Sequence, residues 1–135
     1  MKQVFIGTSG WLAVLIISDF HHANAVDIYL RLLSSGHDLK THDGILLEMG
    51  NALSGIRTRK IAKKLIDTIA ESKRIELVPL TPQPLETSWN LFSERADKNW
   101  GIVDCISFVL MRQLGISEAL TADQHFEQAG FFKLL

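Results

Sequence analysis

The sequence VFIGTSGW, residues 4–11, joins an apolar run to a turn and then to a second apolar stretch. The run at residues 4–6 is rich in β-favouring residues and predicts a short buried strand. The turn is expected at residues 7–10, and Thr8 or Ser9 can cap the buried helix expected over residues 11–17. A buried strand followed at once by a helix is the repeating unit of α/β proteins.

The same alternation of short strands and helices continues along the whole chain. It predicts a three-layer α/β/α fold with a central, mainly parallel, twisted sheet. Because the sequence has no internal repeat and no linker, we expect a single domain over residues 1–135. The expected strands are 4–6, 39–41, 75–80, 119–121 and 131–134, and the expected helices are 11–17, 22–34, 44–53, 59–72, 85–96, 102–114 and 123–129, with Asp43 as the cap of the third helix and Thr58 as the cap of the fourth.

Composition and charge are those of an ordinary globular protein, with 47% hydrophobic and 21% charged residues. The net charge is −1, so any attraction to a polyanion must come from a local patch. The single cysteine, Cys105, excludes an intramolecular disulfide and fits a reducing cytosol, so we expect a cytoplasmic protein. No apolar run approaches the ~20 residues that span a bilayer, so we expect no membrane partner.

Three acids stand near the expected carboxyl ends of strands, where ligands bind in open α/β sheets. Glu48 lies in the helix after the second strand, Asp104 near the start of the apolar helix 102–114, and Asp123 just after the strand 119–121. Asp104 needs a partner in so apolar a stretch, and a metal cation, a basic side chain or backbone N–H groups can provide one. Each acid also has a structural interpretation: a solvated helix residue for Glu48, a carboxylate favoured by the helix dipole for Asp104, and a helix cap for Asp123.

The segments around these acids resemble the PIN domain of VapC-type toxins. The resemblance covers the whole chain in the order of that family's four acidic motifs, at residues 4–13, 47–53, 100–111 and 119–131. It implies that Glu48, Asp104 and Asp123 are both catalytic residues and ligands of Mg²⁺ or Mn²⁺. Ser9 matches a polar residue near the metal and the phosphate. Thr8, beside it, and Asn51, which can share a helical face with Glu48, are further polar residues expected to support the site.

The family pattern implies a metal-dependent endoribonuclease in which the ion activates a water for displacement at an RNA phosphodiester. It also implies a toxin that is neutralised by a small antitoxin protein and that forms a homodimer. The chain departs from the pattern at Gly7, where the family has Asp, and at Gly101 and Val103, where it often has Ser or Thr. Because a lost carboxylate leaves the ion less fixed, and misplacement by about 1 Å can cost roughly 100-fold in rate, we expect weak or absent cleavage. The alternative is a catalytically degenerate PIN domain that binds RNA or an antitoxin.

Two further features have a structural and a functional interpretation. A basic run around one helix start predicts a solvated helix face, with contact to RNA phosphates as the alternative. His125 is expected to be a surface residue near the last carboxylate rather than a ligand. The basic run consists of Arg57, Arg59, Lys60, Lys63 and Lys64.

Overall fold

The computed structural model describes residues 2–135, and its centre is one five-stranded sheet. The strands are β1 (Gln3–Ile6), β2 (Asp38–His42), β3 (Ile75–Val78), β4 (Glu118–Leu120) and β5 (Phe132–Lys133). Their order in the sheet is β3-β2-β1-β4-β5, and every neighbouring pair is parallel. The predicted α/β fold is therefore confirmed, with a sheet that is parallel throughout rather than mainly so.

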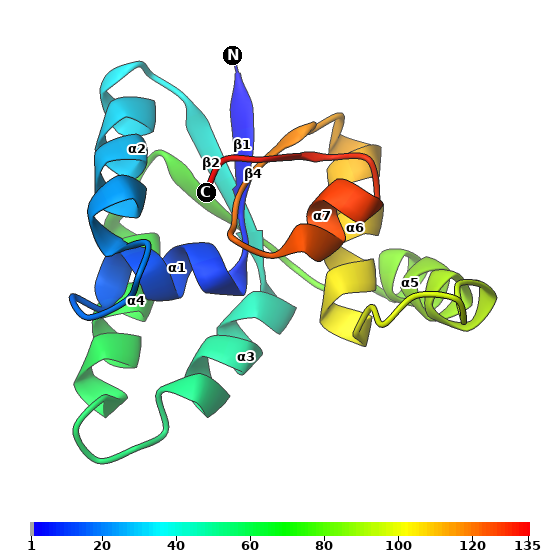
Figure 1. Ribbon diagram of the computed structural model, residues 1–135, viewed down its shortest axis with the longest axis horizontal. Coiled ribbons are helices and arrows are strands. Elements are labelled where there is room, and N and C mark those ends of the chain that lie inside the picture. The colour runs from blue at the N-terminus through cyan, green and yellow to red at the C-terminus, as the bar shows by residue number, and fades with distance from the viewer. Residues whose placement is uncertain (1) are drawn as a thin grey trace.

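Helices cover both faces of this sheet. They are α1 (Thr8–Leu15), α2 (His22–Ser34), α3 (Asp43–Ala52), α4 (Arg59–Glu71), α5 (Pro82–Glu94), α6 (Ile102–Leu114) and α7 (Gln124–Gln128). Figure 1 shows α1, α2 and α4 on one side of the sheet and α6 and α7 on the other, with α5 packed outside α6. Along residues 2–135 no helix combines the length and the apolar character needed to cross a bilayer.

The core lies on both faces of the central strands because helices exclude water from both. In β1, Val4, Phe5 and Ile6 are at most 2% exposed. In α6, the residues Cys105–Met111 are all buried, because this helix packs between the sheet and α5. That burial explains why residues 102–114 show a nearly continuous apolar run instead of the single apolar stripe of a surface helix.

The largest differences between predicted and observed elements occur at two helix starts. The helix α1 begins at Thr8, before the predicted start at Trp11, and Gly7 occupies its N-cap position in an extended conformation. The helix α5 begins at Pro82 rather than at Leu85, because proline suits a first helical turn.

The predicted cap of α3 is wrong. His42, not Asp43, occupies the N-cap position, and the His42 ring nitrogen Nδ1 accepts a hydrogen bond from the Gly44 N–H at 3.0 Å. Asp43 is the first helical residue, and its carboxylate accepts from the Leu80 N–H at 3.3 Å instead. The cap is thus a buried imidazole at the end of β2.

The strand order brings three helix starts to one edge of the sheet. Since β2, β1 and β4 are adjacent and parallel, their carboxyl ends lie side by side. The chain passes from β1 into α1, from β2 into α3 and from β4 towards α7. The start of α6 faces the same edge in Figure 1, so the first turns of four helices surround one place.

Candidate metal centre

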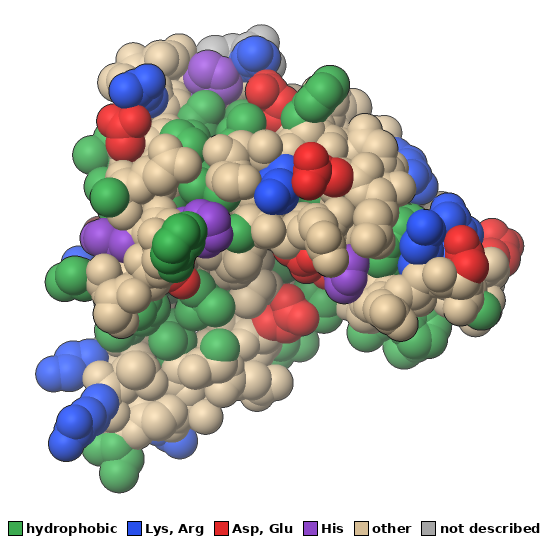
Figure 2. Space-filling model, in the orientation of Figure 1, with side chains coloured by type: hydrophobic (Ala, Val, Ile, Leu, Met, Phe, Trp, Pro, Cys, Tyr) green, Lys and Arg blue, Asp and Glu red, His purple; other side chains and the backbone are tan. Residues whose placement is uncertain are grey.

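A pocket of about 320 Å³ opens at this edge of the sheet. Figure 2 shows acidic side chains and a histidine gathered in the hollow between α3 and α6. The three acids that the sequence singles out, Glu48, Asp104 and Asp123, all line it. The remaining lining residues are Thr8, Ser9, Leu12, Ile45, Ser107, Thr121, His125 and Phe126.

Asp104 is held at the start of α6 by two hydrogen bonds to one of its oxygens. The Gly101 N–H donates to Asp104 Oδ2 at 3.1 Å, which closes a capping interaction over the first turn. His125 Nδ1 lies 3.0 Å from the same oxygen. Burial raises the pKa of the Asp104 carboxyl, and these two hydrogen bonds oppose that shift. Because both bonds use Oδ2, the oxygen Oδ1 remains for a ligand in the pocket.

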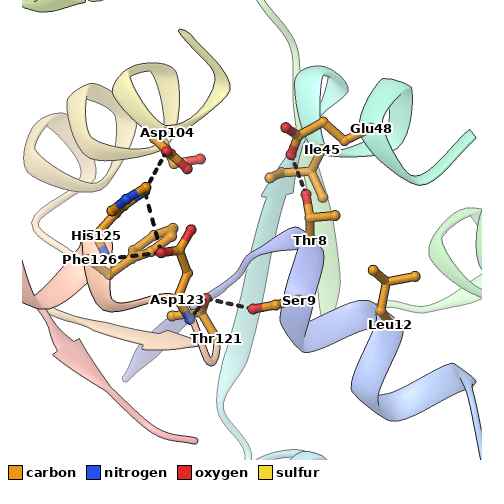
Figure 3. Close-up of a pocket in the computed structure, with 11 residues that line it drawn as sticks. Thr8, Ser9, Leu12, Ile45, Glu48, Asp104, Thr121, Asp123, His125 and Phe126 are labelled. Carbon is orange, nitrogen blue, oxygen red and sulfur yellow. Dashed lines mark hydrogen bonds and ion pairs between the residues drawn. The ribbon is translucent and has the colours of Figure 1, made fainter. Parts of the chain in front are cut away.

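Asp123 is both a helix cap and a pocket residue. Its Oδ1 accepts a hydrogen bond from the His125 N–H at 2.9 Å, so it caps α7 as the sequence suggests. The same oxygen lies 3.4 Å from His125 Nδ1. The cap interaction therefore fixes the carboxylate beside the His125 ring, as Figure 3 shows.

His125 lies beside the last carboxylate, as expected, but it lines the pocket instead of standing on the open surface. Its side chain is only 25% exposed, and its ring lies between the carboxylates of Asp104 and Asp123 (Figure 3). One ligand atom from each of these three residues lies within 4.8 Å of the other two. The available sequence signal was the spacing: His125 stands in the first turn of a helix capped by Asp123, so its ring can fold back over the cap.

Glu48 lies on the opposite side of the pocket, on α3 (Figure 3). Thr8 Oγ1 donates a hydrogen bond to Glu48 Oε1 at 2.5 Å, which joins α3 to the start of α1. Burial raises the pKa of the Glu48 carboxyl, the Thr8 bond lowers it, and the charges of Asp104 and Asp123 raise it further. The three carboxyls therefore lie close enough for the charges of Asp104 and Asp123 to affect the pKa of Glu48.

Ser9 holds the turn that carries Asp123. Its hydroxyl lies 2.9 Å from Thr121 Oγ1 and accepts from the Ala122 N–H at 2.9 Å. Thr121 Oγ1 in turn accepts from the Asp123 N–H at 3.0 Å. Ser9 thus ties the start of α1 to the segment between β4 and α7.

Gly7 has room for a side chain. Its backbone is extended, with φ −88° and ψ 176°, a conformation that any residue adopts. A Cβ added there would lie 3.5 Å from the Phe126 ring and 3.6 Å from the Thr121 side chain, which are ordinary contacts. The glycine is therefore not required by the backbone or by packing.

The other residues singled out from the sequence lie outside the pocket. Asn51 is exposed near the end of α3 and does not line it. The five residues of the basic run are all exposed, around the start of α4. In that run, Arg59 Nε donates to the Ser54 carbonyl at 2.8 Å, and Lys63 pairs with Asp67 at 2.6 Å. The run is solvent-exposed, as both its structural interpretation and the alternative of contact with RNA phosphates require.

Nearly the whole chain matches a known protein family. The PIN domain matches residues 4–132, nearly the whole chain. The chain belongs to the PIN domain family. Over 137 aligned residues it is 27% identical to the 23S rRNA-specific endonuclease VapC20 of two Mycobacterium tuberculosis strains, and 98% of each chain is covered.

Solved structures agree with this assignment. The crystal structure of the M. tuberculosis VapC20 toxin superposes on the PIN domain described above with a TM-score of 0.81, at 27% identity and 95% coverage of both chains. VapBC2 from Rickettsia felis bound to a promoter DNA fragment gives a TM-score of 0.70 at 13% identity, with 98% of this chain and 97% of that one covered. FitAcB from Neisseria gonorrhoeae gives 0.67 at 15% identity, with 96% and 95% covered. The last two likenesses establish the shared PIN fold alone.

Proposed function

We propose that this protein is a divalent-metal-dependent endoribonuclease, the toxin of a toxin–antitoxin pair. The observation that carries the proposal is the convergence of Glu48, Asp104 and Asp123 on one pocket from three separate segments of a PIN domain. Similarity along almost the full length to a 23S rRNA-specific endonuclease supports RNA as the substrate. The proposal also requires that the donors at the pocket suit a metal ion, although Gly7 supplies no side-chain ligand.

The donor set fits a divalent ion with mixed oxygen and nitrogen ligands. Neighbouring ligands of a six-coordinate ion lie about 3 Å apart. One ligand atom from each of Asp104, Asp123 and His125 lies within 4.8 Å of the other two, and an ion bound by His125 Nδ1 would replace the hydrogen bond that this nitrogen makes to Asp104 Oδ2. Imidazole suits Mn²⁺ and later transition ions better than it suits Mg²⁺, which favours carboxylate and water. We therefore infer that Asp104, Asp123 and His125 would hold the ion and that Mn²⁺ would bind more tightly than Mg²⁺.

The residues on the two sides of the pocket have different proposed roles in RNA cleavage. When bound, the ion supplies Lewis-acid stabilisation of the phosphodiester under attack. Glu48, fixed by Thr8 on the opposite side, is placed to orient a water molecule towards the phosphorus. The Ser9–Thr121 contact holds the turn before Asp123, so the ion would keep its place relative to Glu48.

A small antitoxin and a second copy of the chain are the proposed protein partners. VapC20, 27% identical to this chain, is a Sarcin-Ricin loop cleaving toxin, and the resemblance to VapC-type toxins implies an antitoxin. Large apolar side chains stand uncovered between α1 and α2, with Ile17 84% and Phe20 94% exposed. Such surface is typical of protein interaction sites. Light scattering of the purified chain, alone and co-expressed with its genomic neighbour, tests both partners.

The alternative is a PIN domain that binds RNA or an antitoxin without cutting. Gly7 is the specific observation that favours it, because the first carboxylate of the resembled family pattern is absent at a position where a Cβ would meet only ordinary contacts. Removing one acid from a hard-cation site lowers both its charge and its ligand count.

One experiment separates the two functions. RNA cleavage and Mn²⁺ binding are measured for the unaltered chain, for Gly7→Asp and for Asp104→Asn, with Glu71→Gln, an exposed acid on α4, as the control. Cleavage by the unaltered chain that Asp104→Asn abolishes and Glu71→Gln preserves supports the nuclease. Cleavage only after Gly7→Asp supports the non-cutting domain, and neither metal binding nor cleavage in any variant rejects both.

A further inference from the structure

The end of β2 carries two fully buried polar residues, Thr41 and His42, whose side chains, adjacent in a strand, point to opposite faces of the sheet. Both are 0% exposed. Thr41 Oγ1 accepts from Trp11 Nε1 at 3.3 Å and donates to the Ile6 carbonyl at 3.1 Å, directly before Gly7. Thr41 thus secures the segment that leads from β1 into α1 and Thr8.

His42 makes the corresponding contact with α6. Since its Nδ1 accepts from the Gly44 N–H, the ring proton of the neutral imidazole resides on Nε2. Nε2 therefore donates to Ser107 Oγ at 2.8 Å, and Ser107 donates to the Val103 carbonyl at 3.0 Å. Burial lowers the pKa of His42 to about 3, so the ring stays neutral and this chain of donors persists at neutral pH.

The chain of hydrogen bonds ends at the residue before Asp104. Val103 precedes Asp104 in the first turn of α6, and Ser107 lies one turn further along the same helix and lines the pocket. His42 itself is the N-cap of α3, the helix that carries Glu48. One buried imidazole therefore links the two helices that bring Glu48 and Asp104 to opposite sides of the site.

The local sequence accommodates this ring. A Cβ added at Gly44 would lie 2.7 Å from His42 Cε1, so only glycine leaves space for the imidazole at the start of α3. An apolar side chain could fill the same volume without needing hydrogen-bond partners, whereas a satisfied buried polar network specifies a single arrangement of the groups it joins. His42 and Gly44 together therefore fix α6 in one position, which an apolar side chain of the same volume would not do.

We propose that His42 is a positioning residue, which through Ser107 fixes the start of α6 and so holds the Asp104 carboxylate at its place opposite Glu48. The effect on metal binding and catalysis rests on the proposed function, but the placement of α6 does not. Loss of an outer partner that orients a metal ligand typically weakens metal binding roughly 10- to 100-fold.

The first test compares two buried serines. Ser107→Ala removes the hydroxyl that links His42 to Val103. Ser88→Ala is the matched control, because Ser88 is also 0% exposed and donates to the carbonyl four residues earlier, Pro84 O at 2.6 Å, but lies on α5 outside the pocket. Mn²⁺ affinity is measured by the paramagnetic resonance of the free ion, and backbone amide exchange is followed at residues 102–107.

We expect Ser107→Ala to weaken Mn²⁺ binding roughly 10- to 100-fold and to speed amide exchange at residues 102–107, while Ser88→Ala changes neither. His42→Gln keeps a donor near the place of Nε2 and should bind Mn²⁺ like the unaltered protein, whereas His42→Leu should resemble Ser107→Ala. Equal Mn²⁺ affinity and equal exchange in Ser107→Ala and the unaltered protein would overturn the inference.

Failure of the proposed function gives a different result. If the unaltered protein binds no Mn²⁺, the metal-dependent function is rejected, and amide exchange alone decides the role of His42. Faster exchange at residues 102–107 in Ser107→Ala but not in Ser88→Ala then still supports the positioning of α6, and identical exchange in both rejects it.

Discussion

A Cβ at Gly7 would make only ordinary contacts with Phe126 and Thr121, two residues that line the pocket, so Gly7→Asp is expected to be tolerated by the fold. As the N-cap of α1, Asp would also accept from the free N–H groups of the first turn, worth a few tenths of a kcal/mol over glycine. We expect unchanged or slightly higher stability in urea and tighter Mn²⁺ binding by calorimetry. A loss above about 1 kcal/mol would mean that the space beside Phe126 and Thr121 is not available.

In the proposed ligand set, His125 is the one nitrogen donor, so we expect it to determine which ion the pocket prefers. His125→Asp replaces the nitrogen donor with oxygen, the ligand that Mg²⁺ favours. We expect the ratio of Mn²⁺ to Mg²⁺ affinity to fall by about tenfold, or about 1.4 kcal/mol, in competition titrations. As a control, His22→Asp alters a histidine outside the pocket and should leave the ratio of Mn²⁺ to Mg²⁺ affinity unchanged. An unchanged ratio in His125→Asp would show that the imidazole is not a ligand of the ion.

At the scale of elements, the close seating of α1 on β4 depends on Gly10. A Cβ at this position would lie 2.0 Å from the Leu120 carbonyl oxygen, so Gly10→Ala must push α1 away from the strand. Overpacking of this kind costs about 1–3 kcal/mol, and we expect that loss in urea denaturation. Gly50→Ala is the control: Gly50 lies within α3 with nothing near its added Cβ, so alanine should stabilise the protein by up to about 1 kcal/mol. Equal stabilities of the two variants would contradict the close approach.

The elements themselves were largely predictable because their signals are local. The apolar runs that became β1 and β4 and the glycine that ends α6 act over a few residues, and Gly115 indeed adopts φ +71°. The cap of α3 was not predictable in this way. His42 serves as a cap only because Gly44 leaves space for its ring and Ser107, from a distant helix, accepts the hydrogen bond from its Nε2–H.

The pocket residues likewise divide into those that the sequence could predict and those whose place depends on long-range contacts. Glu48, Asp104 and Asp123 could be located from the sequence because their joint placement near expected strand ends agrees with the order of the acidic motifs in the PIN resemblance, although each acid alone has a structural interpretation. The place of His125 depends on the start of α6 reaching its ring, a long-range contact without a periodic signal. Asn51 shares a helix with Glu48 but lies outside the pocket, because α3 turns it to solvent.

For the molecule as a whole, His42 makes stability depend on pH. Its pKa is lowered from 6.5 to about 3 in the folded protein, so between these values the unfolded chain binds the extra proton. The stability that the neutral His42 ring contributes to the folded protein is therefore complete above pH 6.5. As the pH falls towards 3, the free energy of unfolding decreases by about 1.4 kcal/mol per pH unit. Glu48 and Asp104, whose pKa values are raised, act in the opposite sense, so the comparison must be with a variant that lacks only the histidine.

His42→Gln supplies that comparison. Urea denaturation between pH 7.5 and pH 4 should show a stability difference between the two proteins that shrinks or reverses as the solution becomes more acidic. The difference should be constant above about pH 6.5. Parallel curves over the whole range would show that the ring titrates alike in the folded and unfolded chains.

The position of β4 inside the sheet, between β1 and β5, has a consequence for the protein while it is being made. Asp123 and His125 reach the pocket only after β4 has inserted beside β1, the strand formed by the first residues of the fold. A nascent chain that has not yet released residues 118–125 from the ribosome therefore has neither this inner strand nor half of the site. If the completed protein cuts ribosomal RNA, this order of assembly shields the ribosome that is translating it until translation has passed that segment.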